Sequence, residues 1–363
     1  MMKVLFAGGG TGGHLFPAIA IAERLVGSSG IDVMFVGTKN KIEARVVPQL
    51  GYKFRTLWIG GFSRKFRMSN LLLPLKVIVS IIQSLRLLFS YRPNVVVGTG
   101  GYVSGPICAA AVMTGTPIVL QEHNSYPGVM TRMFAPFARE THIAFEASRR
   151  YFRVQKNLRL TGSPVRRMPK LSREEGLSYF GLSASRRTLL VTGGSLGAVR
   201  LNSAVLQVVD DLTGRNYQLI WQTGASDFER VSECRNIHPD SIRVEKFVEK
   251  MEYAYAAADI AVCRGGATTV AELVYFNLPS LIVPYPYAAA NHQVENARAL
   301  VDSGAAVMVE ESQIADIFRA TLLDLIDHPE KLERMRDRIK NLSHRDAAET
   351  IAKSIMAIGG ANE

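Results

Sequence analysis

The chain has 363 residues, 47% hydrophobic and 21% charged, which suits a globular enzyme and provides enough apolar surface for two domain cores. Its three cysteines lie far apart without a C-x-x-C spacing, which excludes a disulfide framework and a zinc site, and the lack of an apolar leader predicts a cytosolic protein. The net charge of +11 is unevenly distributed: residues 1–165 carry 20 basic and 6 acidic side chains, whereas the remainder carries 23 basic and 26 acidic ones. The basic first half predicts an anionic partner, either a nucleic acid or a membrane surface.

The first predicted strand, residues 4–7, runs into five glycines and His14 at positions 8–14, and Pro17 is expected as the first helical residue. Such a junction directs backbone N–H groups and the positive end of a helix at an anion such as a phosphate. The loop also matches the G-x-G-x-x-G pattern of dinucleotide sites. However, the next strand, residues 31–36, ends without the acidic residue that binds a ribose, which disfavours NAD and leaves NADP only weakly allowed.

An apolar run at residues 71–89 is interrupted by one proline and two basic residues, which argues against a membrane-spanning helix. Two interpretations remain open: a core helix, or a helix that lies on the bilayer with its basic side chains on anionic headgroups. Residues 51–100 contain no acidic side chain, which favours the membrane interpretation. The basic side chains in question are Arg64, Lys65, Arg67, Lys76 and Arg86.

The pattern of strand, glycine loop and helix recurs along the chain. A strand at 95–97 runs into the glycine-rich stretch 98–106, and a strand at 117–120 delivers Gln121, Glu122, His123 and Asn124 at its carboxyl end, where open α/β sheets bind ligands. After a hinge at 162–164 the pattern restarts with a strand at 188–192, a glycine loop at 193–198 and a helix at about 201–212. This repetition predicts two doubly wound α/β domains, residues 1–163 and 164–363, facing each other across a cleft, with a last helix that can pack back on the first domain.

Residues 263–272 end one predicted strand and start a helix, so their N–H groups are expected to bind a phosphate. Glu272 is either the partner of Thr269 in a capping box or the acceptor for two ribose hydroxyls. The polar stretch 291–293 suits a polyhydroxylated ligand or caps a helix, and Arg166 either reaches a diphosphate or is only solvated. The sequence has no D-x-D and no H-E-x-x-H, so we expect metal-free chemistry.

These motifs together resemble the MurG family, the UDP-N-acetylglucosamine transferases of peptidoglycan synthesis, which have the GT-B fold. The resemblance covers the whole chain and implies an amino-terminal domain that binds the acceptor and the membrane and a carboxyl-terminal domain that binds the UDP-sugar. The matching motifs, in family order, are GGGTGGH at 8–14, GTGGYVSGP at 98–106, GSPVR at 162–166, GGSLGA at 193–198, CRGGATTVAE at 263–272 and NHQVENA at 291–297.

The resemblance also implies roles for individual residues. His14 is the candidate general base, and no metal ligand or cofactor is expected. In the carboxyl-terminal domain, the substrate-binding residues would be Ser195 at the diphosphate, the Val248 backbone at the uracil, Ala267, Thr268 and Thr269 at the phosphates with Val270 and Ala271 following, Glu272 at the ribose, and His292 and Gln293 at the sugar. From the amino-terminal domain, Thr11, Gly12, Gly13 and Asn124 would approach the donor, and Arg166 would contact the nucleotide.

Two positions depart from the family pattern. The family has HEQN where this chain has Gln121, Glu122, His123 and Asn124, so the histidine lies two places later. Because side chains in a strand alternate with period two, His123 is expected on the face that Gln121 occupies. The family also has glutamine where this chain has Leu196. Neither position is assigned a catalytic role.

The reaction implied is transfer of N-acetylglucosamine from UDP to the 4-hydroxyl of the muramyl sugar in lipid I, undecaprenyl-pyrophosphoryl-MurNAc-pentapeptide, giving lipid II with inversion. The expected partners are UDP-N-acetylglucosamine, lipid I and an anionic membrane surface, with no nucleic acid, and the expected location is the cytoplasmic face of the inner membrane. The alternatives are another GT-B enzyme that glycosylates a lipid, a UDP-sugar 2-epimerase, an NADP-dependent oxidoreductase and a non-catalytic membrane-docking protein. An epimerase would leave residues 64–92 unexplained, and an oxidoreductase would leave the motifs of the second domain unexplained.

Overall fold

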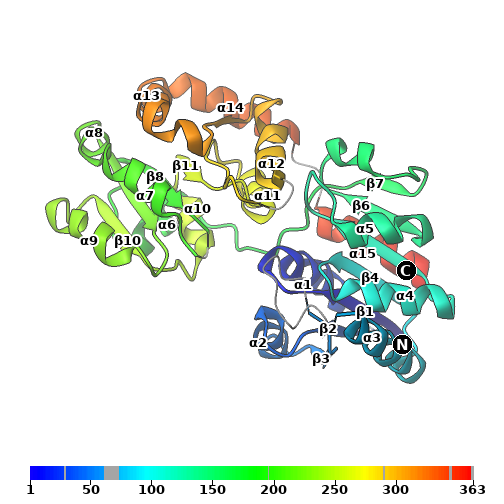
Figure 1. The fold of residues 1–363 in the computed structure, drawn as a ribbon. Coiled ribbons are helices and arrows are strands. Elements are labelled where there is room, and N and C mark those ends of the chain that lie inside the picture. The colour runs from blue at the N-terminus through cyan, green and yellow to red at the C-terminus, as the bar shows by residue number, and fades with distance from the viewer. Residues whose placement is uncertain (28–29, 61–72, 195, 289–290, 343–345, 361–363) are drawn as a thin grey trace. The chain divides into compact units, whose positions relative to one another are not determined.

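The structure is a computed structural model that describes all residues except 28–29, 61–72, 195, 289–290, 343–345 and 361–363. The chain divides into two compact units, Met1–Arg167 together with His344–Glu363, and Met168–Ser343. The carboxyl-terminal helix α15 (Ala347–Gly359) therefore belongs to the first unit, where Figure 1 shows it in red. Arg166 also lies in the first unit.

The first unit is built on a parallel sheet of seven strands in the order β3-β2-β1-β4-β5-β6-β7. Its helices include α1 (Gly12–Val26), α2 (Ile42–Gln49), α3 (Leu73–Tyr91), α4 (Ser104–Thr114) and α5 (Val129–Phe134). The strands are β1 (Met2–Gly8), β2 (Ile31–Gly37), β3 (Lys53–Thr56), β4 (Val95–Gly100), β5 (Ile118–Glu122), β6 (Glu140–Ile143) and β7 (Leu158–Leu160).

Both faces of this sheet are covered, which explains why its central strands are apolar without alternation. Val4 and Phe6 of β1 pack with α1 and α15 on one face, whereas Leu5 and Ala7 pack on the other face with α3 and α4. Helix α15 contributes Ile351 and its neighbours Ala352 and Ile355 to the first of these cores. Each fully buried isoleucine stabilises the fold by about 1.5–3 kcal/mol.

Helix α1 begins five residues before the position that the sequence predicted. It starts at Gly12, so Pro17 lies inside the helix and is not its first residue. Proline lacks the N–H that would bond to the carbonyl four residues earlier, so the helix loses only its bond to Gly13. The early start places His14 in the first helical turn, directly after the glycine loop.

The second unit contains a six-stranded parallel sheet in the order β10-β9-β8-β11-β12-β13. The strands are β8 (Arg187–Thr192), β9 (Tyr217–Gln222), β10 (Ile242–Glu245), β11 (Ile260–Cys263), β12 (Ser280–Ile282) and β13 (Ala306–Met308). The helices are α6 (Arg173–Phe180), α7 (Val199–Leu206), α8 (Val209–Gly214), α9 (Phe228–Ile237), α10 (Met251–Ala257), α11 (Ala267–Tyr275), α12 (His292–Val301), α13 (Ile314–Asp327) and α14 (Pro329–Leu342).

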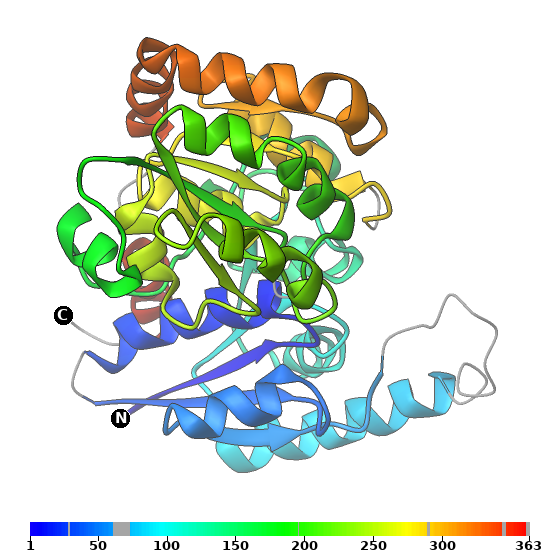
Figure 2. The ribbon, with the colours of Figure 1, turned by 90° about the vertical axis from the view of Figure 1, so that its left-hand side faces the viewer.

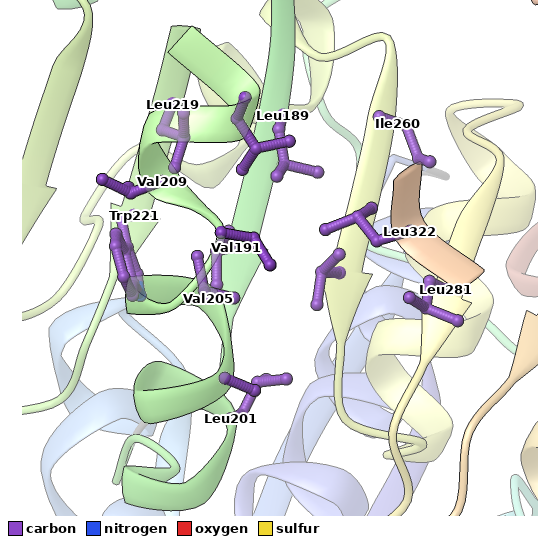
Figure 3. Packing of buried hydrophobic residues seen from close by; sticks show 14 of the residues in the cluster. Leu189, Val191, Leu201, Val205, Val209, Leu219, Trp221, Ile260, Leu281 and Leu322 are labelled. Carbon is purple, nitrogen blue, oxygen red and sulfur yellow. The ribbon is translucent and has the colours of Figure 1, made fainter. Parts of the chain in front are cut away.

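The core of the second unit surrounds Trp221 of β9, which packs with Val191 of β8 and Val205 of α7 (Figure 3). The indole N–H of this buried tryptophan donates to Asn202 Oδ1 at 3.0 Å, so its polar atom is satisfied. The single helix predicted at about 201–212 is two helices, α7 and α8, because the backbone leaves the helical conformation at Val208.

In both sheets the order of strands reverses at one point, between β1 and β4 in the first unit and between β8 and β11 in the second. Ligands of open parallel sheets bind outside the carboxyl ends of the strands at such a point. The four glycine loops that follow β1, β4, β8 and β11 are the ones that the sequence singled out. Strand order thus brings them together in pairs.

Candidate functional site

The glycine loop after β1 is held by a buried carboxylate from α2. Glu43 Oε2 accepts from the Gly10 N–H at 3.0 Å, and Glu43 Oε1 accepts from the Thr38 N–H and hydroxyl at 3.0 and 2.8 Å. Glycine is required here, since a Cβ on Gly9 would lie 2.7 Å from the Glu43 carboxyl carbon and Gly10 has φ +87°. The Gly10 N–H is therefore used within the protein, and an anion at this loop would have to use other N–H groups.

His14 lies where the loops after β1 and β4 meet. Its Nδ1 is 3.1 Å from the Thr99 carbonyl oxygen, and the Thr99 hydroxyl donates to the His14 carbonyl at 2.8 Å. A carbonyl can only accept, so Nδ1 carries the proton and the lone pair of the neutral ring lies on Nε2. A Cβ on Gly100 would lie 2.6 Å from His14 Nδ1, which explains the glycine after Thr99. This tautomer is the one in which Nε2 acts as a base.

The loop after β5 brings His123 and Asn124 to His14. The imidazole rings of His14 and His123 pack edge to face with centroids 4.9 Å apart. Asn124 Nδ2 is 3.1 Å from His123 Nε2 and 3.2 Å from Glu122 Oε1. Because an amide nitrogen can only donate, His123 accepts this bond through Nε2. The histidine that departs from the family pattern thus packs directly against His14.

Glu122 supports this loop. Its Oε1 accepts from the Asn124 N–H at 3.0 Å as well as from the amide, and its Oε2 accepts from the Gly128 N–H at 2.8 Å. The side chain is buried. Glu122 therefore orients Asn124 and is not suited to act as a base.

The other predicted residues of the first unit lie near the start of α1. Thr11 is the N-cap residue of α1, with an extended backbone and no capping bond from its side chain, and Gly12 and Gly13 begin the helix. The Arg166 guanidinium carbon lies 5.1 Å from the centre of the Phe16 ring, a cation-π distance. Arg166 is thereby placed beside the first turns of α1.

In the second unit, Gln222 at the end of β9 connects the glycine loop after β8 with the loop after β10. Its Nε2 donates to the Gly194 carbonyl at 3.0 Å and to Thr192 Oγ1 at 3.2 Å, and its Oε1 accepts from the Val248 N–H at 2.8 Å. The Val248 N–H is therefore occupied, and a uracil contact through this backbone would use the carbonyl. Ser195, predicted at the diphosphate, lies outside the described residues.

The amino terminus of α11 follows β11 at the point where the strand order reverses. Gly266 is the N-cap residue, and no side chain caps the helix. The N–H groups of Ala267, Thr268 and Thr269 have no acceptor within the helix, as in every first helical turn, and form the positive end of its dipole. In contrast, the Val270 N–H donates to the Gly266 carbonyl at 2.9 Å and its side chain is buried, and Ala271 follows inside the helix.

The capping box predicted as the alternative for Glu272 does not form, because the helix begins at Ala267 and Thr269 already lies within its first turn. Instead, Glu272 Oε2 accepts from the hydroxyl of Tyr255 in α10 at 2.9 Å. Burial, and next the Glu272 carboxylate, raise the pKa of Tyr255 well above its usual value of 10, so this hydroxyl stays protonated. The interaction holds the carboxylate at the side of α11.

His292 and Gln293 form the first turn of α12, whose N-cap residue Asn291 has φ +55°. Gln293 Oε1 accepts from the Tyr285 N–H at 2.9 Å, and a Cβ on Gly265 would lie 2.4 Å from the Gln293 carbonyl oxygen. The loop after β11 and the start of α12 are thus in direct backbone contact. The predicted residues 267–269, 272, 292 and 293 therefore lie at one edge of this sheet.

Helix α3 has an unusual distribution of side chains. Its buried side includes Ser80 and Ser84, whose hydroxyls donate to carbonyls of the same helix, and it packs on α4. Several of its large apolar side chains are exposed, among them Ile78 (57%) and Phe89 (67%), with Leu75, Val77 and Ile82, whereas Leu88 and Tyr91 are buried in the core. Figure 2 shows α3 in cyan at the border of the first unit. Helix α3 is thus in part a core helix, through Leu88 and Tyr91, and in part an exposed apolar surface.

Within the described part of the chain, one helical segment, Pro74–Tyr91, is long and apolar enough to cross a membrane by length and composition, and 22% of it is buried. By itself this is weak evidence for a span. Arg64, Lys65 and Arg67, predicted to meet headgroups, lie outside the described residues. In the same described part, no three histidine, cysteine or acidic side chains form a group that could hold a metal ion.

Both halves of the sequence match models of one protein family. Residues 4–143 match the glycosyltransferase family 28 N-terminal domain, and residues 188–351 match the glycosyltransferase family 28 C-terminal domain. The chain belongs to glycosyltransferase family 28. It is therefore a glycosyltransferase, and the NADP-dependent oxidoreductase alternative is wrong.

Relatives of this family 28 chain cover nearly its whole length. Proteins from Chlorobaculum parvum, 43% identical over 98% of this chain and 99% of their own length, and from Thermoanaerobacter pseudethanolicus, 37% identical over 98% and 100%, are each named UDP-N-acetylglucosamine--N-acetylmuramyl-(pentapeptide) pyrophosphoryl-undecaprenol N-acetylglucosamine transferase. The crystal structure of MurG from Acinetobacter baumannii is 25% identical, with a TM-score of 0.78 over 98% of this chain and 100% of that chain. A UDP-N-acetylglucosamine 2-epimerase, 11% identical with a TM-score of 0.65, shares the fold alone. The GT-B fold predicted from the sequence is confirmed.

Three supporting residues were not found from the sequence: Glu43, Gln222 and Tyr255. Gln222 is the last residue of β9, and polar residues at the carboxyl ends of strands in such sheets are candidates for a ligand site. Glu43 and Tyr255 lie on helices without a motif, and only the packing of these helices reveals their partners.

Proposed function

We propose that this family 28 enzyme transfers N-acetylglucosamine from UDP-N-acetylglucosamine to the 4-hydroxyl of the muramyl sugar in lipid I, forming lipid II with inversion. The observation that carries the proposal is His14, fixed by Thr99 at the reversal point of the first sheet, in a chain whose relatives carry the name of this transferase. The first unit would bind the acceptor and the membrane, and the second unit the donor.

The donor half of the reaction would use the loops of the second unit. The N–H groups of Ala267, Thr268 and Thr269 suit the phosphates, because a helix amino terminus carries about half a positive charge. Glu272 would accept from the ribose hydroxyls, and the Val248 carbonyl would contact the uracil. Ser195 at the diphosphate, and His292 with Gln293 at the sugar, complete the proposed donor contacts.

The acceptor half would use His14. Its Nδ1–H donates to Thr99, so Nε2 can take the proton of the acceptor hydroxyl as that oxygen attacks the anomeric carbon. The bond between the anomeric carbon and the phosphate oxygen breaks in the same step, UDP leaves with the electron pair, and the configuration inverts. Thr11, Gly12, Gly13 and Asn124 would approach the donor sugar from this side.

The charge that develops on departing UDP needs stabilisation. Preorganised N–H groups at the start of α11 would supply it, since they require no reorganisation during the reaction. Arg166 lies beside α1 and would add a positive charge at the nucleotide. This account requires no metal ion, in keeping with the absence of a D-x-D motif from the sequence.

We further propose that the enzyme docks on an anionic membrane surface through α3. A lipid-linked acceptor stays in the bilayer because its hydrocarbon chain is costly to hydrate, so the enzyme has to reach the surface. Helix α3 exposes large apolar side chains, carries Lys76 and Arg86 among them, and packs its serines on the protein. A spanning helix would place both charges in hydrocarbon, at about 2.5–3.5 kcal/mol each on insertion scales. This favours docking, at the cytoplasmic face where UDP-sugars are present.

The deciding experiment is a transfer assay with purified protein, UDP-N-acetylglucosamine and a lipid I analogue. We expect a product with one added N-acetylglucosamine in β-linkage, and release of UDP. UDP-glucose offered as donor is the control for sugar choice. Interconversion of UDP-N-acetylglucosamine with its 2-epimer, without transfer, would establish the epimerase alternative instead.

A further inference from the structure

We propose that Tyr255 is a positioning residue whose hydroxyl orients the Glu272 carboxylate for a nucleotide that carries both ribose hydroxyls. The inference rests on the proposed role of Glu272 in binding UDP. It assigns to a buried side chain of α10, outside every sequence motif, a part in distinguishing ribonucleotides from nucleotides without these hydroxyls.

The geometry around Tyr255 supports an orienting role. Tyr255 is buried, and its ring stacks on Phe276 with centroids 4.9 Å apart and planes inclined by 24°. Phe276 directly follows α11, the helix that carries Glu272, so the ring is fixed relative to that helix. The hydroxyl then lies 2.9 Å from Glu272 Oε2. A rigid donor on one helix thus meets a carboxylate on the next.

The protonation of Tyr255 fixes which group of the pair donates the hydrogen bond. Burial keeps Tyr255 protonated, so its hydroxyl donates and the Glu272 carboxylate accepts. A glutamate side chain has several rotamers, and one of its oxygens held by a fixed donor has lost much of that freedom before a ligand arrives. A vicinal diol would then meet an acceptor that is already oriented, which is how preorganisation raises affinity.

A purely structural role for the pair is the competing explanation. The hydrogen bond would then only join α10 to α11, and its loss would lower the stability of the second unit without a preference between nucleotides. The two explanations differ in what happens to a ligand that lacks the ribose hydroxyls.

The experiment measures binding of UDP and of 2′,3′-dideoxy-UDP by calorimetry to the full-length protein and to Tyr255→Phe. We expect Tyr255→Phe to weaken UDP binding by about 5- to 30-fold, as for an indirect effect of a hydrogen bond to a charged group, and to change dideoxy-UDP binding by less than about twofold. Tyr217→Phe is the matched control, because this tyrosine is also buried in the second unit but opens β9 at the amino-terminal edge of the sheet. It should leave both affinities unchanged.

Glu272→Ala separates failure of this inference from failure of the proposed ribose contact. If Glu272→Ala binds UDP and dideoxy-UDP as the unchanged protein does, Glu272 does not bind the ribose, and both proposals are overturned. A second outcome is that Glu272→Ala loses UDP affinity while Tyr255→Phe either keeps it or loses affinity for UDP and dideoxy-UDP equally. That outcome overturns only the positioning role. In the Glu272→Ala background, Tyr255→Phe should have no further effect on UDP binding.

Discussion

The candidate site residues of this glycosyltransferase are held by fixed partners. His14 is held by Thr99 and packed against His123, and Glu272 is held by Tyr255. Thr99 belongs to the motif at 98–106, whereas Tyr255 lies outside every motif. The behaviour of His14 and Glu272 therefore depends on neighbours from other strands and helices.

His14→Ala tests the proposed base. Loss of proton transfer in the transition state should lower kcat by about 10²- to 10⁴-fold, while UDP affinity stays nearly unchanged, because the loops that would bind UDP lie mainly in the second unit. Steady-state kinetics and UDP calorimetry on the folded variant check this. Turnover close to that of the unchanged enzyme would remove His14 from the mechanism.

His142 of β6 predicts a dependence of stability on pH. Burial lowers its pKa from 6.5 to about 4, opposed by nearby Glu140 and assisted by Arg159. The unfolded chain therefore binds more protons between these values, so stability is complete above pH 6.5 and falls as the pH drops toward 4, by about 3 kcal/mol at most. Urea unfolding between pH 6.5 and 4 should show that the free energy of unfolding falls less with decreasing pH in His142→Gln than in the unchanged protein. The same substitution at exposed His328 is the control, and identical slopes in all three proteins would contradict the prediction.

At the scale of elements, loops and helices acquire their roles from what they pack against. The glycine loop after β1 is shaped by α2 through Glu43, and α3 buries its serines while it exposes several large apolar residues. Neither arrangement follows from the element's own sequence.

Glu43→Gln tests the support of the glycine loop. Replacing one acceptor oxygen by an amide nitrogen leaves either Gly10 or Thr38 without its partner, so stability should fall by about 1–3 kcal/mol. The displaced loop should also lower kcat. Urea denaturation and a transfer assay measure the two effects. Glu146→Gln is the control, since this exposed carboxylate pairs with Arg149 at the surface. An unchanged unfolding midpoint would show that Glu43 does not hold the loop.

Two variants of α3 test membrane docking and separate its parts. Lys76→Gln with Arg86→Gln should weaken binding to anionic vesicles by about 2 kcal/mol, roughly 30-fold, and the difference should shrink in high salt. Ile78→Ser with Phe89→Ser should weaken binding at all salt concentrations, since exposed apolar area would no longer enter the bilayer.

Vesicle sedimentation measures both effects, and transfer to a short-chain soluble acceptor should survive in both variants. Lys246→Gln with Lys340→Gln, two exposed basic residues of the second unit, is the charge-matched control. Equal sedimentation of all variants, or no dependence on anionic lipid, would place the docking surface elsewhere.

At the scale of the whole molecule, the two units are built on parallel sheets whose strand order reverses at one point. The chain returns to the first unit through α15, where buried Arg24 of α1 pairs with Asp346 at 2.6 Å and with Glu349 at 3.8 Å. Helix α15 also covers Val95 and the neighbouring strands with Ile351 and Ile355. The end of the sequence is thus part of the first core.

Metal independence is the prediction at this scale, because it depends on the whole set of groups around departing UDP. Helix amino termini and Arg166 should stabilise the leaving group, so EDTA should leave the transfer rate of the purified enzyme within about twofold. Loss of activity in EDTA, restored by Mg²⁺ or Mn²⁺, would show that these groups do not suffice.

The sequence by itself determined the class of fold and the loops that matter. A buried strand followed by a glycine turn can be recognised from neighbouring residues alone, because a strand covered on both faces is a continuous apolar run and the turn depends on the residues that follow it. The local pattern also marks residues 267–269 as a phosphate site and Glu272 as a ribose acceptor or part of a helix cap. The role of His14 came from the family resemblance, and these roles stay predictions. The start of α1 was misplaced, because proline at the second turn costs only one bond and does not fix a boundary.

Only the tertiary structure decided which residues orient these groups and which faces are exposed. Glu43 lies 33 residues from Gly10, and Tyr255 lies 17 residues from Glu272, so their contacts arise from the order of strands and not from local pattern. The capping box at Thr269 was consistent with the sequence, but it does not form because α11 begins at Ala267. Which residues of α3 are buried and which are exposed likewise depends on neighbouring elements, whose positions an isolated segment does not encode.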